Sequence, residues 1–251
     1  MVTTSENAIP WTVAALRLTL FPAPSAAIDA SSWWTDVVGE DPESEVSNPR
    51  AGHRSYDGSW SDGRLALSMK ADRIDWRLSV REDPHDLFAG LGPLDSVGNK
   101  FRELMNRWFA LPSCPTALRV AFGAILHHPV LTREAGYRLF SNLLPLKIDP
   151  VGSTDLLYQI NRPRASNAGL AGLRVNRLAK WVVAIGTLAT LVPELTGVKS
   201  TPLTTKFACN LELDMNTSPD FQEVIARDSL PAVFEELVRF GGEIAQLGDT
   251  P

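Results

Sequence analysis

The sequence contains few of the residues from which catalytic and metal-binding sites are most often built. Only two of its 251 residues are cysteines and only four are histidines. Cys114 and Cys209 lie far apart and form no CxxC or zinc-binding pattern, so we expect two free, buried thiols; a long-range disulfide is the alternative. His127 and His128 are adjacent, and on a strand their side chains would point in opposite directions. A metal site built on histidine or cysteine is therefore not expected.

The sequence motifs of common enzyme classes are missing as well. The chain has no GxGxxG fingerprint, no P-loop, no HExxH pattern and no GxSxG nucleophile elbow. Because no catalytic constellation is complete, we favour a protein that is not an enzyme and carries no cofactor.

Long hydrophobic runs are absent too. The longest apolar run, at residues 181–192, is too short to span a bilayer. The first ten residues include Glu6 but no lysine or arginine, and Arg17 interrupts the apolar stretch that follows. A secretory signal peptide has the opposite arrangement, with positive charge before an uninterrupted apolar segment. We therefore expect a soluble, cytoplasmic protein with no membrane contact.

The chain has no strong excess of charge of either sign. Its formal net charge is −5 and its isoelectric point is about 5.4. A mildly acidic surface does not attract nucleic acid unless basic residues cluster locally, so we do not expect nucleic acid as a partner. Hydrophobic residues make up 44% of the chain, which is enough for a sizeable core.

Alternation of apolar and polar residues, which has the period of a strand, recurs along the chain. It predicts strands at residues 12–21, 53–60, 65–69, 74–80, 116–122, 155–161, 173–191 and 204–215. Helical spacing predicts helices at residues 25–38, 94–109 and 132–144, and a last helix that begins near Ser218-Pro219 and ends at Gly248. Consecutive strands are mostly joined by short turns, which favours antiparallel pairing. The predicted fold is α+β, with mostly antiparallel sheets and helices packed on one face.

Two stretches of the chain resemble each other. Residues 155–181 read DLLYQINRPRASNAGLAGLRVNRLAKW, and residues 54–76 also run through a glycine-containing connection to arginine, an aliphatic residue and tryptophan. Arg73 and Arg177 match at an offset of 104 residues, and the tryptophans that follow them match at 105. A near-constant offset is what an old tandem duplication with small insertions leaves. Chance similarity between short segments is the alternative.

The duplication predicts two similar halves, at residues 1–112 and 113–251, each with the element order β-α-β-β-(β)-α. Related units most often associate about a two-fold axis, so we expect the halves to lie side by side; one continuous domain is the alternative. The stretch around Arg73 and the order of elements resemble those of conserved bacterial proteins, a resemblance that implies no residue roles. A homo-oligomer is compatible with this pattern.

Arginines gather in and beside the loop of the second stretch. The candidate ligand-binding residues are Arg162, Arg164, Arg174 and Arg177, with Arg54 and Arg73 as their counterparts in the first half. The guanidinium group suits bidentate capture of a carboxylate or a phosphate. The alternative is a loop whose arginines pair with the carboxylates of this acidic protein itself.

Carboxylates alternate along the strand at residues 204–215. Spacing of two places Glu212 and Asp214 on one face, together with the amides of Asn210 and Asn216. Oxygen ligands of this kind could hold a hard cation such as Mg²⁺. The alternative is the polar outer face of a half-buried strand, which alternation alone predicts.

These features lead to two functional hypotheses. The first is a cytosolic, non-enzymatic binding protein that engages a protein partner through a groove or sheet surface near the arginine-rich loop at residues 161–177. The second is a protein that binds or processes a nucleotide or another anionic small ligand. In that case the arginines would hold phosphate, and Glu212 and Asp214 would hold Mg²⁺.

Overall fold

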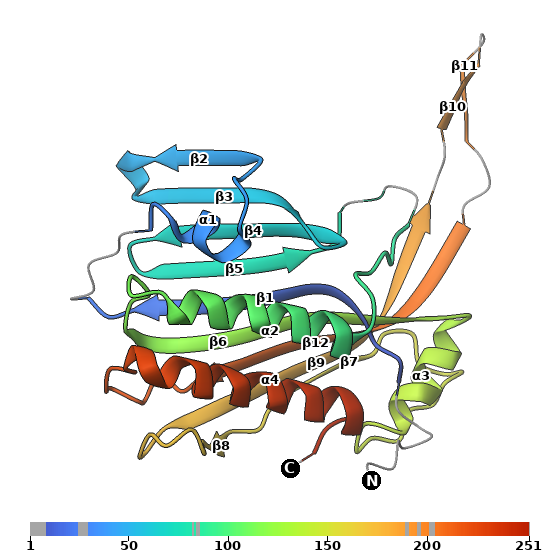
Figure 1. Cartoon of the computed structure of the whole chain (residues 1–251). Coiled ribbons are helices and arrows are strands. Elements are labelled where there is room, and N and C mark those ends of the chain that lie inside the picture. Colours follow the sequence, from blue (N-terminus) through green and yellow to red (C-terminus); the bar gives the residue numbers. More distant parts are fainter. Residues whose placement is uncertain are drawn as a thin grey trace.

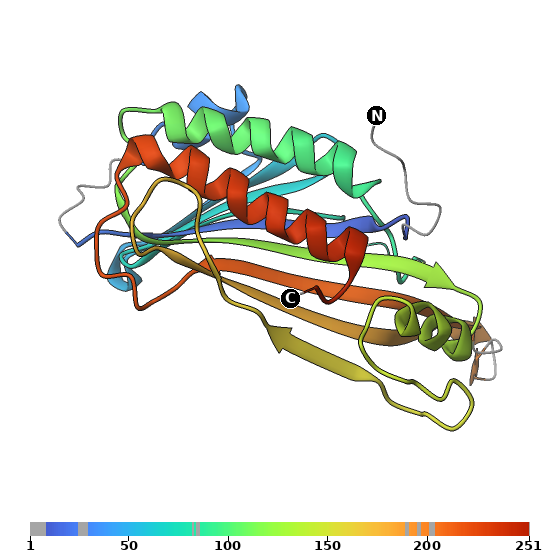
Figure 2. The ribbon, with the colours of Figure 1, turned by 90° about the horizontal axis from the view of Figure 1, so that it is seen from below.

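A computed structural model shows an antiparallel sheet of ten strands with α-helices on one of its faces (Figures 1 and 2). It describes residues 9–24, 30–81, 83, 86–188, 191–194, 197–200 and 204–250. The predicted α+β class, with antiparallel strands and helices packed on one face, is confirmed. None of the described helices is both long and apolar enough to cross a membrane.

The elements follow one another in an order that is mostly strand. The strands of the sheet are β1 (Thr12–Pro22), β2 (Ser44–Asn48), β3 (His53–Trp60), β4 (Gly63–Lys70), β5 (Arg73–Ser79), β6 (Ala117–Val130), β7 (Leu157–Asn161), β8 (Arg164–Ala165), β9 (Arg174–Leu188) and β12 (Thr204–Thr217). The helices are α1 (Trp33–Val38), α2 (Leu94–Ala110), α3 (Arg133–Ser141) and α4 (Leu230–Leu247), with short 3-10 turns at Pro49–Ala51 and Arg227–Ser229. A separate hairpin consists of β10 (Leu191–Glu194) and β11 (Gly197–Ser200), and it projects beyond the ends of β9 and β12 (Figure 1).

Short connections fix which strands become neighbours. The order across the sheet is β2-β3-β4-β5-β1-β6-β12-β9-β7, and β8 also pairs with β9. Strands β3 and β4 are joined by Ser61 and Asp62, and Ser61 adopts a positive φ of 51°. Two-residue turns of this kind bring consecutive strands together as antiparallel hairpins. The long strands β1 and β6 pair in the middle of the sheet and carry it continuously from the first part of the chain to the second.

The core lies between the sheet and its helices. Helices α2 and α4 lie side by side over the central strands (Figure 2), and the residues that face them are buried. Trp33 and Trp34 of α1 meet Trp76 of β5 and Trp108 of α2, with ring centroids 5.3 to 6.2 Å apart. Each large aromatic that is fully buried contributes on the order of 2 to 3 kcal/mol. Four of the seven tryptophans therefore anchor one end of the core.

The last helix begins later than the sequence predicts. Ser218 ends β12: its amide donates to the carbonyl of Arg174 at 2.8 Å, and its own carbonyl accepts from Phe221 in a turn. The chain then pairs Ile225 with Ala117 before α4 starts at Leu230. The cap-then-proline signal at Ser218-Pro219 thus marks a turn after β12, because the Ser218 amide is already bonded to Arg174 at the start of β9. Of the predicted helix at residues 25–38, only Trp33–Val38 is helical, and residues 25–29 lie outside the described part.

The two arginines that the sequence similarity pairs, Arg73 and Arg177, do not lie on equivalent strands of the sheet. Arg73 lies on β5, which pairs directly with the central strand β1. Arg177 lies on β9, which is separated from the central strand β6 by β12. The two arginines therefore occupy different places in the sheet, and the duplication stays a prediction.

Candidate functional site

The arginine-rich loop lies against the end of α4. Arg162 donates hydrogen bonds from Nε and Nη2 to the two carboxylate oxygens of Asp249, at 2.5 and 2.8 Å. The hydroxyl of Tyr158 donates to the same carboxylate at 2.6 Å. Hydrogen bonding from Arg162 holds the pKa of Asp249 below its ordinary value. These contacts tie the loop and the edge strand β7 to the residues that follow α4.

Two further arginines of the predicted cluster surround an aromatic ring of α4. The guanidinium carbons of Arg164 and Arg177 lie 5.8 and 5.3 Å from the centre of the Phe240 ring. Arg164 also donates to Glu243 at 3.3 Å, and Arg177 Nη2 lies 4.0 Å from the same carboxylate. Arg177 is only 1% exposed, and this burial lowers its pKa. The structure therefore uses Arg164 and Arg177 to pack the loop, in agreement with the alternative in which arginines pair with the chain's own carboxylates.

The other three candidate arginines lie apart from this cluster. Arg174 begins β9 and is exposed, and no described residue accepts a hydrogen bond from its side chain. Arg54 lies on β3, where it forms an ion pair with Glu45 at 3.6 Å. Arg73 lies on β5 and donates to both oxygens of Asp75, at 2.6 and 2.9 Å. The six arginines thus do not form one site.

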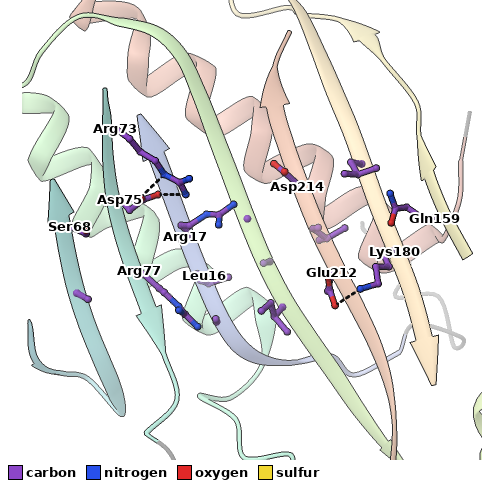
Figure 3. A pocket seen from close by; sticks show the side chains of 17 residues that line it. Leu16, Arg17, Ser68, Arg73, Asp75, Arg77, Gln159, Lys180, Glu212 and Asp214 are labelled. Carbon is purple, nitrogen blue, oxygen red and sulfur yellow. Dashed lines mark hydrogen bonds and ion pairs between the residues drawn. The ribbon is translucent and has the colours of Figure 1, made fainter. Parts of the chain in front are cut away.

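Glu212 and Asp214 project from β12 on the opposite face of the sheet from the buried Arg177 (Figure 3). Lys180 forms an ion pair with Glu212 at 3.0 Å, and Asp214 accepts a hydrogen bond from Asn216 at 3.2 Å. Among the described residues there is no group of three or more side chains that could hold a metal ion together. The sheet separates the buried Arg177 from these carboxylates, whereas Arg73 lines the same depression as they do, so a site that joins phosphate to Mg²⁺ stays a prediction.

The face of the sheet that carries Glu212 and Asp214 has a depression of about 650 Å³ (Figure 3). No described helix covers this face, and we call it the open face. Small or apolar residues of five strands line the depression, including Ala15, Ala66, Gly123, Ile125 and Leu178. The charged residues that line it are Arg17, Arg73, Asp75, Arg77, Lys180, Glu212 and Asp214. The depression therefore combines small and apolar strand residues with charge of both signs.

Two of the arginines that line the depression occupy paired positions on neighbouring strands. Arg17 of β1 and Arg77 of β5 are cross-strand partners in the antiparallel ladder. Like charges in this position destabilise a sheet, typically by a few tenths of a kcal/mol to about 1 kcal/mol. No described residue accepts a hydrogen bond from either guanidinium group, and the Nε atom of Arg17 is buried without a partner. Among the described residues, neither guanidinium group therefore contributes a hydrogen bond to the stability of the fold.

A glycine makes room for the Arg17 side chain. Gly123 of β6 lies opposite Arg17 on the other side of β1. A Cβ atom at this position would lie 3.4 Å from Nη2 and 3.5 Å from Nε of Arg17, so the guanidinium group extends over the glycine. The side chain consequently lies along the floor of the depression (Figure 3).

Most other charges on the open face have partners in the chain. Arg64 of β4 bonds to Asp57 and to Glu43, the latter at 3.2 Å. Asp75 accepts from Arg73 and also from the hydroxyl of Thr19, at 2.6 Å. Hydrogen bonding to Asp75 is the main cause of the raised pKa of Arg73, and Asp214 contributes from across the depression. Arg17 and Arg77 differ from these residues because no described carboxylate or hydroxyl forms a hydrogen bond or an ion pair with them.

The thiols of the chain do not offer a nucleophile. Cys114 and Cys209 are free and buried, as the sequence predicts, and burial raises the pKa of each to about 12. A thiol with this pKa stays protonated at neutral pH, and the protonated form is a poor nucleophile. His127 is 5% exposed, and burial lowers its pKa, so its ring is neutral at pH 7.

Sequence reasoning missed both Arg17 and Arg77. Each occupies a polar position within an alternating strand, between buried neighbours such as Leu16 and Leu18 or Trp76 and Leu78. The alternation indicates that both side chains face away from the core. It does not indicate that β1 and β5 are neighbours, or that their register places the two arginines opposite each other.

Comparison with known proteins identifies no family and no relative for this chain. A scan against protein-family models finds no match, and a search of curated proteins finds no relative.

Proposed function

We propose that this chain is a non-enzymatic binding protein that holds an acidic segment of a protein partner on the open face of its sheet. The observation that carries the proposal is the pair Arg17 and Arg77, which oppose each other at the depression without a partner among the described residues. A partner's carboxylate placed between them would relieve the repulsion and supply the missing acceptor. Arginine suits this role because its planar group donates two parallel hydrogen bonds to a carboxylate.

The charge of the partner follows from the same pair. The chain as a whole is acidic, with a net charge of −5, so two unpaired guanidinium groups form a local exception. An acidic segment would be attracted to this place and repelled by much of the remaining surface, which favours one orientation of binding. The proposed surface is the open face; the loop arginines Arg162, Arg164 and Arg177 serve the packing of α4 instead.

Binding fits the described side chains better than covalent catalysis does. Both thiols are buried and protonated, and the one buried histidine ring is neutral and unpartnered at Nε2. Two free cysteines are typical of a reducing compartment, which supports the proposal that the protein acts in the cytosol.

A fluorescence anisotropy titration tests the proposal with a defined probe. The probe is a fluorescein-labelled, twelve-residue peptide that contains four glutamates, and its counterpart has glutamine at those positions. We expect the wild-type chain to bind the glutamate peptide more tightly, with an affinity that falls as salt rises. Changing both Arg17→Gln and Arg77→Gln should weaken this binding roughly tenfold, as expected for two exposed charge pairs.

Arg54→Gln is the matched control, because Arg54 is also an exposed arginine on a strand but already pairs with Glu45. It should leave the affinity unchanged. Equal binding of the two peptides by the wild-type chain, or equal losses for the control and the double variant, would overturn the proposal.

An anionic small molecule is the second candidate for the same depression. The volume of about 650 Å³ lies within the range of small-ligand sites. A thermal-shift titration with ADP, with and without Mg²⁺, tests this reading, since a ligand that binds only the folded state raises its melting temperature. An upward shift that Arg17→Gln and Arg77→Gln abolish would favour the small ligand over the protein segment.

A further inference from the structure

The row of residues across the centre of the depression carries opposite charges at its two ends. The ladder aligns Arg77 of β5, Arg17 of β1, Gly123 of β6 and Asp214 of β12 as successive cross-strand neighbours. Neighbouring strands lie about 4.8 Å apart, so β1 and β12, with β6 between them, lie roughly 10 Å apart. The glycine contributes no side chain to the middle of this row, and the Arg17 guanidinium group extends over it. The cationic pair Arg17 and Arg77 and the anionic Asp214 therefore lie on the two sides of Gly123.

Asp214 forms no ion pair within 4.0 Å among the described residues. It accepts a hydrogen bond from Asn216, and from across the depression it contributes to the raised pKa of Arg73. The neighbouring carboxylate shows the difference. Glu212 lies opposite Lys180 on β9 and pairs with it at 3.0 Å, whereas the residue opposite Asp214 on β9 is Leu178.

Asp214 and Arg17 also leave each other unpaired. They occupy the positions paired with Gly123 on the two strands that flank it, yet neither an ion pair nor a hydrogen bond joins them. A ligand that satisfies only the arginines would place its negative charge near Asp214, which would weaken its binding. A ligand with a positive group at the far end would convert this repulsion into attraction.

We infer that the segment held on the open face is bipolar: it places an acidic side chain at Arg17 and Arg77 and a basic side chain at Asp214. This inference rests on the proposed function and adds the second half of the partner's chemistry. An extended chain advances about 3.3 Å per residue and turns successive side chains to opposite sides, so two side chains that both face the sheet would be two residues apart, at roughly 7 Å, and their own length spans the rest. Lys180 and Glu212 neutralise each other in the next row, so they need no group from the partner.

Two peptides of equal length test the inference. One carries a glutamate and, two residues later, a lysine; in the other a second glutamate replaces the lysine. NMR titration of the ¹⁵N-labelled full chain is suitable because it detects weak binding and shows where the peptide lies. We expect the wild-type chain to prefer the glutamate–lysine peptide by about fivefold, the effect of one exposed ion pair.

The variant Asp214→Lys should reverse this preference, because the charge at this position becomes positive. Glu212→Gln is the matched control: it removes a carboxylate two residues away that already has a partner, and it should keep the wild-type preference. Circular dichroism establishes that both variants are folded before they are titrated.

The outcomes separate this inference from the proposal on which it rests. If the wild-type chain binds both peptides equally on the open face and Asp214→Lys changes neither affinity, the inference is wrong and the proposed function stands. If neither peptide shifts the signals of the open-face strands, both fall.

Discussion

The two faces of one sheet use the same kind of residue in opposite ways. On the helix-covered face, Arg177 is buried beside Phe240 and Glu243. On the open face, Arg17 and Arg77 stand opposite each other, and no described residue accepts a hydrogen bond from them. Arginine on the first face belongs to the packing of α4, whereas arginine on the second is available to a ligand.

The difference shows that a cluster of arginines in the sequence is weaker evidence of a site than the contacts those arginines make. The loop that contains Arg162 and Arg164 has the densest group of arginines in the chain, and its members bond to Asp249 and Glu243. Arg17 and Arg77 are 60 residues apart in the sequence and become neighbours only through the pairing of β1 with β5. A charge that the fold leaves unpaired, at a cost to the sheet, is the stronger indication of function.

The largest expected effect is on the helix-covered face. Arg177→Ala should lower the free energy of unfolding by about 3 kcal/mol, because it leaves a cavity beside Phe240 and removes the hydrogen bonds to Thr250. Urea unfolding followed by tryptophan fluorescence measures this change. Arg174→Ala, three residues earlier and exposed, is the control and should change the free energy of unfolding by less than about 0.5 kcal/mol. A loss below about 1 kcal/mol for Arg177→Ala would show that this buried arginine contributes little to the stability of the fold.

The next largest effect is a dependence of the free energy of unfolding on pH. The hydrogen bonds from Arg162 hold the folded-state pKa of Asp249 below its ordinary value of 3.8. The stabilisation is therefore fully present above the unfolded-state pKa and is lost as pH falls through the folded-state pKa. Replacing Asp249 by asparagine should cost about 1 to 2 kcal/mol at pH 7 and much less near pH 2. Unfolding free energies from pH 2 to pH 7 test this, and a cost that is the same at both ends would rule out the carboxylate as its source.

A smaller effect of opposite sign is expected on the open face. Arg77→Ala removes one of two like charges in a cross-strand pair, so it should leave the free energy of unfolding unchanged or raise it by up to about 0.5 kcal/mol. Arg64→Ala on β4 is the contrast, because Arg64 pairs with Asp57 and Glu43; its loss should lower stability slightly. The same urea series measures both variants. If Arg77→Ala destabilised the chain more than Arg64→Ala, Arg77 would stabilise the fold and would not be free to serve a ligand.

An effect of similar size is predicted at Gly123 in the depression. Gly123→Ala places a methyl group at ordinary contact distance from the Arg17 guanidinium group, and Gly123 has no positive φ that only glycine tolerates. Its free energy of unfolding should rise by about 0.5 kcal/mol, because alanine restricts the unfolded chain. Thermal unfolding measures the change, and a marked loss of stability would show that the glycine serves the fold rather than the space above it.

The sequence predicts the fold class well and the site poorly, for a physical reason. Alternation within β1, β4, β5 and β12 is a local property, and it correctly indicates strands that bury one side. The start of α4 is missed because Ser218 satisfies its backbone through Arg174, a contact between distant parts of the chain. The site depends on register in the same way. Alternation in the sequence places Glu212 and Asp214 on one polar face of β12. Only the pairing of the strands shows that Asp214 lies across Gly123 from Arg17.

The central claim is that the open-face arginines serve a ligand and not the fold. The most direct test measures two quantities on one variant, Arg17→Gln combined with Arg77→Gln: its free energy of unfolding, and its affinity for the twelve-residue glutamate peptide. The claim predicts an unchanged or slightly raised free energy of unfolding together with a roughly tenfold loss of affinity. A loss of stability above about 1 kcal/mol with unchanged affinity would contradict it.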